Sequence, residues 1–246
     1  MKFRDQIFEK AKSSGKTLVL PEGQDERVAK AAEVIAKEKL ASVIILATPE
    51  EQKQSMKDVS YEGLDVTILD FLQASEAEKL AELFYDLRSH KGVTREMAAE
   101  TVQDRLYFGN LMLRSGMADG LVAGSIASTS DMMRAALRCV GTTPHVDVAS
   151  SCFVMDLASP APNGEENLLY ADCGLNTCPN ADQLVDIAVS TAQTRKLLVG
   201  DEPRIAFLSF STKGSADHEL VTKMARATQM TKERIEEENL GYKVDG

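Results

Sequence analysis

Short runs of consecutive apolar residues alternate with amphipathic stretches along the first half of the chain. The apolar runs predict buried strands at residues 17–20, 42–47, 66–69 and 121–123. A strand that is apolar at every position is typical of a parallel sheet covered on both faces. The intervening stretches carry apolar residues at helical spacing and predict helices, among them residues 75–89, 94–103 and 105–115. This order predicts an α/β fold with a mostly parallel sheet.

Local signals place two of the helices. Apolar residues recur with the spacing of one buried helix face in the segment after Pro21-Glu22-Gly23, at Val28, Ala31, Ala32 and Ile35. Thr48 is followed by a proline and, three residues after the threonine, by a glutamate. That arrangement is typical of a helix start with a capping box.

The pattern changes after Gly141. Residues 148–157 and 167–172 form two strand-like runs around a turn rich in Pro, Asn and Gly, which predicts a β-hairpin. A helix that opens at Asn180, a strand at 205–209 and a helix at about 217–238 follow. We therefore expect two α/β domains, residues 1–143 and residues 144–246, the second containing the hairpin.

Charge and composition exclude several classes of partner. The 246 residues include 28 Lys and Arg against 38 Asp and Glu, a net charge of −10, which disfavours general binding to nucleic acid or to an anionic membrane. No apolar run approaches the ~18 residues of a membrane span, and the first residues are charged. We therefore expect a cytoplasmic protein with neither nucleic acid nor membrane as a partner.

The cysteines and histidines give no metal or disulfide pattern. Cys139, Cys152, Cys173 and Cys178 match neither a disulfide framework nor a usual zinc knuckle, and we expect them to be buried thiols. His218-Glu219 begins like the helix of a zinc protease, but Thr222 stands where the second histidine would be. The sequence predicts no metal site.

Loops rich in Gly, Ser and Thr follow three of the predicted strands. They lie at residues 125–131, 176–180 and 211–215, whereas GxGxxG, Walker A and GxSxG motifs are absent. Helix capping alone explains any one such loop. Three together, with free backbone N–H groups near helix starts, favour a ligand that carries phosphate.

Two arginines and one aspartate are candidates for function. Arg134 lies near the start of a predicted helix, where a cation does not stabilise the helix dipole, so we favour an anion-binding role. Arg88 ends a predicted helix, and anion binding and dipole stabilisation remain equal alternatives for it. Asp172, at the end of a strand, is a general base or a hydrogen-bonding brace, and we favour the brace.

Five segments, in order along the chain, resemble the phosphate acetyltransferase family and its phosphate butyryltransferase relatives. They are residues 88–92, 118–124, 129–134, 171–176 and 208–212. The resemblance implies two three-layer α/β domains with a cleft between them, similar to the isocitrate/isopropylmalate dehydrogenase-like fold, and a homodimer. It also implies reversible transfer of acetyl from acetyl-CoA to inorganic phosphate, which gives acetyl phosphate. These small molecules are the expected partners, and no metal or permanently bound cofactor is expected.

The resemblance also assigns candidate site residues. It implies that Arg88 and Arg134 bind coenzyme A. Cleft-lining donors to phosphate are implied at Ser128, Thr129, Asn176, Ser211 and Thr212. The implied mechanism is direct attack of the CoA thiolate on the carbonyl of acetyl phosphate, which needs a base for the thiol and positive charge on the leaving phosphate.

In one respect the chain departs from the resemblance. The family's proposed thiol base, an aspartate, and its phosphate-anchoring Ser-Arg pair lie beyond residue 246, so the catalytic residues are unknown and we expect a C-terminally shortened member. Two alternatives therefore stay open beside acetyl transfer: a phosphate butyryltransferase and a catalytically silent module that binds CoA or phosphate. A decarboxylating dehydrogenase is disfavoured because no metal-binding cluster of aspartates is apparent.

Overall fold

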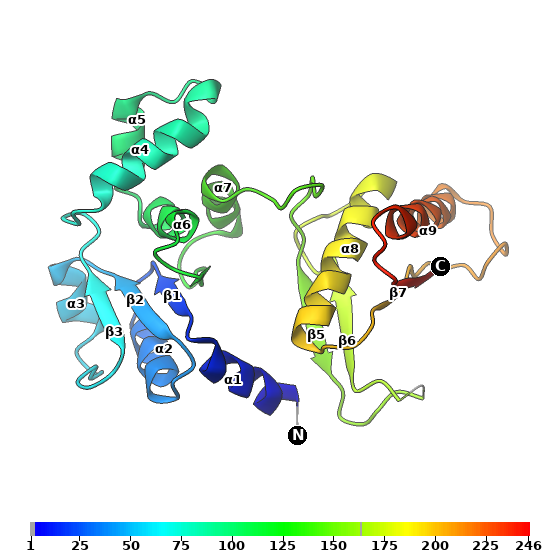
Figure 1. The fold of residues 1–246 in the computed structure, drawn as a ribbon, viewed down its shortest axis with the longest axis horizontal. Coiled ribbons are helices and arrows are strands. Elements are labelled where there is room, and N and C mark those ends of the chain that lie inside the picture. The colour runs from blue at the N-terminus through cyan, green and yellow to red at the C-terminus, as the bar shows by residue number, and fades with distance from the viewer. Residues whose placement is uncertain (1–2, 163) are drawn as a thin grey trace. The chain divides into compact units, whose positions relative to one another are not determined.

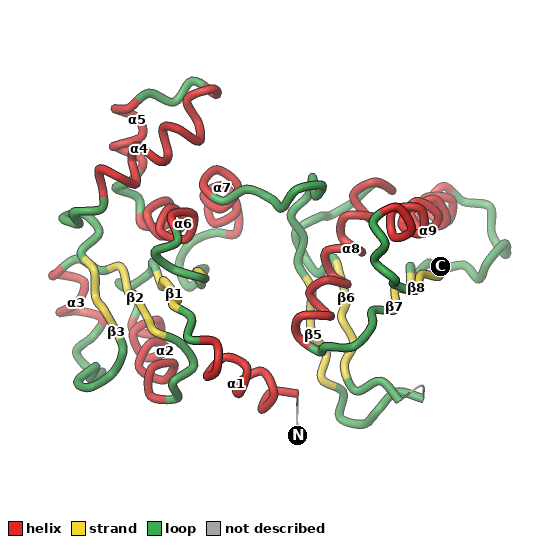
Figure 2. The backbone as a smooth tube through the Cα atoms, viewed as in Figure 1, coloured by secondary structure: helices red, strands yellow, loops and turns green. Residues whose placement is uncertain are grey.

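The computed structural model describes residues 3–162 and 164–246, and the chain divides into two compact units, residues 4–141 and residues 142–246 (Figure 1). Helices and strands alternate in both units, so the predicted α/β class is confirmed (Figure 2). Three residues lie outside the described part of the chain: Met1 and Lys2 of the predicted first domain, and Asn163 of the predicted hairpin turn.

A four-stranded parallel sheet forms the centre of the unit at residues 4–141. Its strands are β1 (Thr17–Leu20), β2 (Ser42–Leu46), β3 (Val66–Leu69) and β4 (Gly120–Leu121), in the order β3-β2-β1-β4. The strand predicted at residues 121–123 is thus shorter than expected and begins one residue earlier. Because all four strands are parallel, their carboxyl ends share one edge, and the loops after β1 and β4 are neighbours there.

Helices cover both faces of this sheet. The helices of this unit are α1 (Phe3–Ser14), α2 (Glu26–Lys37), α3 (Pro49–Ser55), α4 (Ala77–Arg88), α5 (Arg95–Thr101), α6 (Arg105–Ser115) and α7 (Thr129–Cys139), with a short 3-10 helix η1 (Ser89–Lys91) after α4. Helix α2 covers one face and α4, α6 and α7 cover the other, whereas α1 buries none of its residues. The packing follows from alternation along β1. Val19 packs with α4, α6 and α7, whereas its neighbour Leu20 packs with α2 on the other face. The unit is therefore a three-layer sandwich.

The buried face of α2 differs from the prediction. Ala29, Ala32 and Ala36 are buried, whereas Ala31 is exposed. Small side chains lie against the sheet because they allow close approach of the helix, and the larger apolar residues Val28 and Ile35 cover the edge of the contact. The capping box at Thr48 and Glu51 is confirmed.

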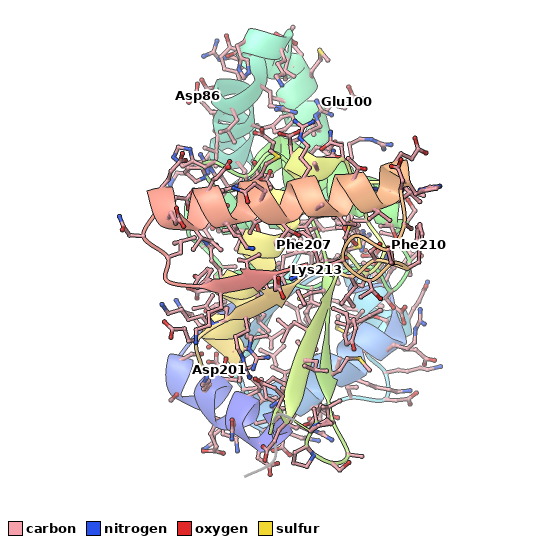
Figure 3. All side chains as sticks on the ribbon, turned by 90° about the vertical axis from the view of Figure 1, so that its right-hand side faces the viewer. Asp86, Glu100, Asp201, Phe207, Phe210 and Lys213 are labelled. Atoms are coloured by element: carbon pink, nitrogen blue, oxygen red, sulfur yellow. The ribbon has the colours of Figure 1, made fainter. Side chains whose placement is uncertain are left out.

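The unit at residues 142–246 contains the predicted hairpin and a pair of parallel strands. Its elements are β5 (Cys152–Asp156), β6 (Asn167–Ala171), α8 (Ala181–Leu198), β7 (Arg204–Ala206), α9 (Glu219–Glu237) and β8 (Lys243–Asp245). β5 and β6 are antiparallel, whereas β7 and β8 are parallel. Phe207 follows β7 and belongs to one hydrophobic cluster with Ala227 of α9. Figure 3 shows Phe207 beneath this helix.

Two strands of this unit are shorter than predicted. The apolar run at residues 148–157 forms a strand only at Cys152–Asp156, and the run at 205–209 leaves the sheet after Ala206. The apolar content of a segment overestimates the length of these strands. Leu208, for example, is apolar but lies beyond the end of β7 and is exposed. The capping box at Asn180 and Gln183 is confirmed. None of the described helices combines the length and the apolar character needed to cross a membrane.

Candidate functional site

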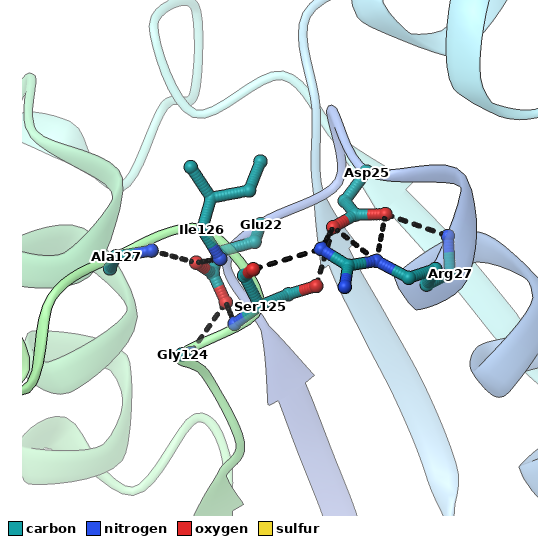
Figure 4. Close-up of polar contacts among 7 residues, drawn as sticks. All are labelled: Glu22, Asp25, Arg27, Gly124, Ser125, Ile126 and Ala127. Carbon is teal, nitrogen blue, oxygen red and sulfur yellow. Dashed lines mark hydrogen bonds and ion pairs between the residues drawn. The ribbon is translucent and has the colours of Figure 1, made fainter.

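The carboxylate of Glu22 lies at the centre of the loop that follows β4. One oxygen accepts hydrogen bonds from the N–H groups of Gly124 and Ser125, and the other accepts from Ile126 and Ala127, at 2.6 to 2.8 Å (Figure 4). Glu22 is only 2% exposed. Burial opposes ionisation, but the four N–H donors outweigh it, so the pKa of Glu22 lies below its usual value. Glu22 is therefore a buried anion held by backbone dipoles.

The residues on either side of Glu22 explain its position. Pro21 ends β1, and Gly23 donates its N–H to the carbonyl of Leu46 at the end of β2. A Cβ on Gly23 would lie 2.5 Å from that carbonyl oxygen, so only glycine allows this close approach. Ser55 donates its hydroxyl to the carbonyl of Gly23. The turn after β1 is thus fixed against β2, and Glu22 is directed towards the neighbouring loop after β4.

A second pair of side chains from the same segment contacts this loop. The hydroxyl of Ser125 donates to the carboxylate of Asp25, and Arg27 donates from Nη2 to the carbonyl of Ser125 at 2.9 Å. Arg27 also forms an ion pair with Asp25 at 2.6 Å (Figure 4). The guanidinium of Arg27 and the hydroxyl of Ser125 hold the pKa of Asp25 well below its usual range. The segment at residues 22–27 therefore fixes both the backbone and a side chain of the loop.

These contacts correct the prediction of a loop with free N–H groups. The N–H groups of residues 124–127 are all taken by Glu22, so this part of the loop holds an internal anion. Ser128 caps α7, accepting from the N–H of Asp131 and donating to its carboxylate. Among the described residues, the N–H groups of Thr129 and Ser130 have no hydrogen-bond partner. In the described segment at residues 124–130, the first turn of α7 therefore still offers backbone donors to a ligand.

Arg134 is exposed but paired. Its side chain is 60% exposed and forms an ion pair with Asp131, one turn earlier on α7, at 2.8 Å. Asp131 lies in the first turn of the helix, where an acidic side chain stabilises the helix dipole. The ion pair with Asp131 therefore partly explains why a cation lies near the start of α7. An exposed ion pair of this kind is weak, so Arg134 can exchange Asp131 for another partner.

Arg88 lies near the other end of α7. Burial raises the pKa of the Cys139 thiol to about 12, and the positive charges of Arg138 and Arg88 offset this rise in part. Arg138, which the sequence did not single out, donates to the hydroxyl of Tyr107 and lies four residues after Arg134, on the same helix face. Arg134 and Arg138 thus lie on α7, and Arg88, at the end of α4, lies near the carboxyl end of α7.

Asp172 organises the loop after β6 in the other unit. Its carboxylate accepts from the N–H groups of Gly174, Leu175 and Asn176, from the side-chain amide of Asn176 and from the hydroxyl of Ser151. Burial would raise its pKa, but these donors lower the pKa to about 2. The prediction of Asp172 as a brace is confirmed. The side-chain amide of Asn176 is part of this brace and also donates to the carbonyl of Ala149.

Ser211 and Thr212 lie in the exposed loop between β7 and α9. The hydroxyl of Ser211 lies 2.8 Å from that of Ser215 and 3.0 Å from the carbonyl oxygen of Thr212. Phe210 and Lys213 flank the pair in the same loop (Figure 3). These two residues and Asn176 belong to the unit at residues 142–246, whereas Ser128, Thr129 and the arginines belong to the other unit.

Comparison with known proteins identifies the family. Residues 2–246 match the family model described as "Phosphate acetyl/butaryl transferase". The chain belongs to the phosphate acetyl/butyryl transferase family. It is 46% identical over 236 residues to a phosphate acetyltransferase of Thermoanaerobacterium thermosaccharolyticum, covering 93% of this chain and 69% of the relative. It is 44% identical over 234 residues to a phosphate acetyltransferase of Acetivibrio thermocellus, covering 95% of this chain and 70% of the relative.

Solved structures agree with this family and with the two-domain α/β fold. The EutD phosphotransacetylase from Staphylococcus aureus has a TM-score of 0.87 and 31% identity, and a phosphotransacetylase from Streptococcus pyogenes has a TM-score of 0.85 and 35% identity. Both matches cover the whole of this chain and 73% of the solved chain.

Within this family member, the residues that sequence reasoning missed are Glu22, Asp25 and Arg27. The available signal was an acidic residue between a proline and a glycine, directly after a buried strand. The cysteine prediction is right for Cys139, which is buried, and wrong for Cys178, which is exposed. Within residues 3–162 and 164–246, no three His, Cys, Asp or Glu side chains are grouped so as to hold a metal ion.

The pKa of Asp172 gives a prediction for stability. The folded value, about 2, lies below the usual 3.8, so the ionised brace stabilises the fold above about pH 4, and this contribution is lost as the pH falls towards 2. Asp172→Asn should lower the free energy of unfolding by roughly 2 kcal/mol at neutral pH, and its difference from the parent protein should shrink between pH 4 and pH 2. Urea unfolding across this pH range measures both quantities.

Asp156→Asn is the matched control, since Asp156 is an exposed carboxylate in the same unit. It should leave the unfolding curve nearly unchanged. A difference between Asp172→Asn and the parent protein that stays constant from pH 7 to pH 2 would contradict the ionised brace.

Proposed function

We propose that this chain transfers an acetyl group reversibly between coenzyme A and inorganic phosphate. The observation that carries the proposal is the 46% identity to a phosphate acetyltransferase across 93% of the chain. In the direction of CoA acylation, the thiolate sulfur attacks the carbonyl carbon of acetyl phosphate, the new C–S bond forms, and the C–O bond to phosphate breaks. The products are acetyl-CoA and inorganic phosphate, and the proton of the thiol passes to a base.

Both substrates are anions, and the exposed Arg134 on α7 and the half-buried Arg88 beside it suit them. Coenzyme A carries several phosphate groups, and a guanidinium binds phosphate through paired, charge-assisted hydrogen bonds. We assign Arg88 and Arg134 to coenzyme A. Arg134 is free to exchange its exposed partner Asp131 for a ligand phosphate, which carries more charge than one carboxylate.

Hydroxyl and amide groups are assigned to phosphate. In the unit at residues 4–141 these are Ser128 and Thr129, supported by the free N–H groups at the start of α7. In the other unit they are Asn176, Ser211 and Thr212, although the side chain of Asn176 acts first as a brace for its own loop. The assignment includes no permanently bound cofactor. Because acetyl-CoA is a soluble metabolite of the cytoplasm, we also assign the chain to that compartment.

An assay of thiol release tests the reaction directly. The purified chain is mixed with acetyl-CoA and phosphate, and the CoA thiol is followed with a chromogenic disulfide, with butyryl-CoA in a parallel reaction. We expect phosphate-dependent release, faster with acetyl-CoA. Faster release from butyryl-CoA would identify a phosphate butyryltransferase, and CoA binding without any release would identify a silent binding module. Both outcomes contradict the proposal.

Arg134→Ala tests the coenzyme A assignment. The substitution removes a charge-assisted contact worth roughly 1.5 to 3 kcal/mol, so the dissociation constant for CoA should rise about tenfold or more. Calorimetric titration of CoA into the folded variant measures it. Arg88→Ala should act in the same direction, and the two effects should not add if both arginines contact one ligand.

Arg114→Ala is the matched control, because Arg114 is an exposed arginine in the last turn of α6. It should leave CoA affinity unchanged. Equal losses of affinity in Arg114→Ala and Arg134→Ala would reduce the effect to overall charge, and the assignment of Arg134 would fail.

We further propose that the chain forms a homodimer through the outer face of the β5–β6 hairpin. Phe153 and Tyr170 are directly opposite each other in this hairpin and are 60% and 50% exposed. Met155 lies on the same face, two residues after Phe153, and is also exposed. An exposed apolar face of this kind is typical of a contact between protein chains, and a second copy offers an identical surface for a two-fold contact.

Phe153→Asp should convert the dimer to a monomer, because it places a charge at the centre of the apolar face. Sedimentation velocity measures the mass in solution. The matched control is Phe210→Asp, since Phe210 is 69% exposed but lies in the loop after β7. The assignment of this face fails if Phe153→Asp remains a dimer, or if both variants dissociate.

A further inference from the structure

Glu22 fills a site that is built to hold an anion. Four consecutive backbone N–H groups converge on its two carboxylate oxygens, and such a concave set of donors is a common binding site for phosphate and other anions. An apolar side chain at this point would leave these four donors without their carboxylate partner. A buried carboxylate is itself unfavourable without compensation, so the two groups depend on each other.

We propose that Glu22 is a positioning residue for coenzyme A: its carboxylate acts as an internal anion that sets the shape of the loop at residues 124–128 and keeps the phosphates of the substrate out of the N–H site. This inference rests on the proposed function. It assigns to Glu22 a part in substrate binding without contact to the substrate.

The chain connects the Glu22 contact directly to the proposed substrate residues. Ala127, the last of the four donors, is followed by Ser128, the N-cap of α7, and Arg134 lies in the second turn of that helix. A shift of the loop therefore moves the start of α7. Gly124 adopts a left-handed conformation with φ of 107° and packs against Met132 of the same helix, which further ties the loop to α7.

The opposite end of the contact is equally fixed. Glu22 precedes Gly23, whose backbone is hydrogen-bonded to Leu46 and to Ser55. Asp25 and Arg27 make their own contacts with Ser125, so the loop cannot rotate about the carboxylate. The four hydrogen bonds to Glu22 therefore fix the start of α7 relative to the carboxyl edge of the sheet.

The position of the N–H site explains why it must be filled. It lies directly before the first turn of α7, where Thr129 and Ser130 retain free N–H groups for a ligand. Without a carboxylate in the site, a substrate phosphate could bind to the four N–H groups of residues 124–127. With Glu22 in the site, the substrate phosphates bind instead at the start of α7 and at the arginines. Glu22 therefore determines where the anionic groups of the substrate bind.

Two variants and one small anion test the proposal. Glu22→Gln keeps the shape of the side chain, but its amide NH₂ faces two of the N–H donors, so the loop shifts. We expect the KM for CoA to rise about tenfold or more with a smaller change in kcat, because the shift displaces a charge-assisted binding contact at α7 and not the reacting atoms. Glu22→Ala empties the site, and formate, a free carboxylate, should bind there.

Formate at tens of millimolar should therefore restore much of the CoA affinity of Glu22→Ala and raise its melting temperature. The parent protein should respond to neither formate nor chloride at the same ionic strength. Glu26→Gln is the matched control, because Glu26 is an exposed glutamate at the start of α2, and it should behave as the parent protein.

The outcomes separate this proposal from the proposed function. If the parent protein neither turns over acetyl-CoA nor binds CoA, the proposed function fails, while the melting temperature of Glu22→Ala in formate still tests whether the site takes an anion. If the parent protein is active and folded Glu22→Gln keeps its KM for CoA, the positioning role is overturned. A folded Glu22→Ala whose melting temperature and CoA affinity do not change with formate also overturns it.

Discussion

A buried carboxylate must be compensated, and in this chain backbone N–H groups compensate it. Glu22 binds the loop after β4 through four N–H groups. Asp172 binds the loop after β6 through three N–H groups and the side chain of Asn176, and it also accepts from Ser151 before β5. Glu22 is buried and Asp172 is half-buried, and in each case the donors compensate the desolvation of the charge. Each unit thus has one loop whose conformation depends on a single ionised side chain, and both loops carry residues that we assign to the substrates.

The contacts of Glu22 show that the loop after β4 is not an open anion site. A loop rich in Gly, Ser and Thr after a parallel strand is commonly an anion site, but here the protein supplies the anion itself. The groups that we assign to the substrate are the free N–H groups in the first turn of α7, the hydroxyl of Thr129 and exposed guanidinium groups such as Arg134. Side chains can adapt to a flexible ligand such as coenzyme A, whereas the backbone behind them stays fixed by Glu22.

Local patterns in the sequence predicted local structure well. The capping boxes at Thr48 and Asn180 were found because their partners lie three residues apart. The contact between Glu22 and residues 124–127 was missed because its partners are about a hundred residues apart and meet only when β1 and β4 pair. Arg134 was singled out as an unusual cation, and its ion pair with Asp131, three residues earlier, partly explains its position. Strand ends were overestimated where apolar residues such as Leu208 are exposed, since burial is set by tertiary packing.

The central claim is that the protein's own carboxylate, and not the substrate, occupies the N–H site after β4. A crystal structure of the chain with coenzyme A and phosphate tests this most directly. Our account predicts that the N–H groups of residues 124–127 stay on Glu22, and that the phosphates of coenzyme A lie beside Arg134 and Arg88. A phosphate group bound by those four N–H groups, with Glu22 turned away, would contradict it.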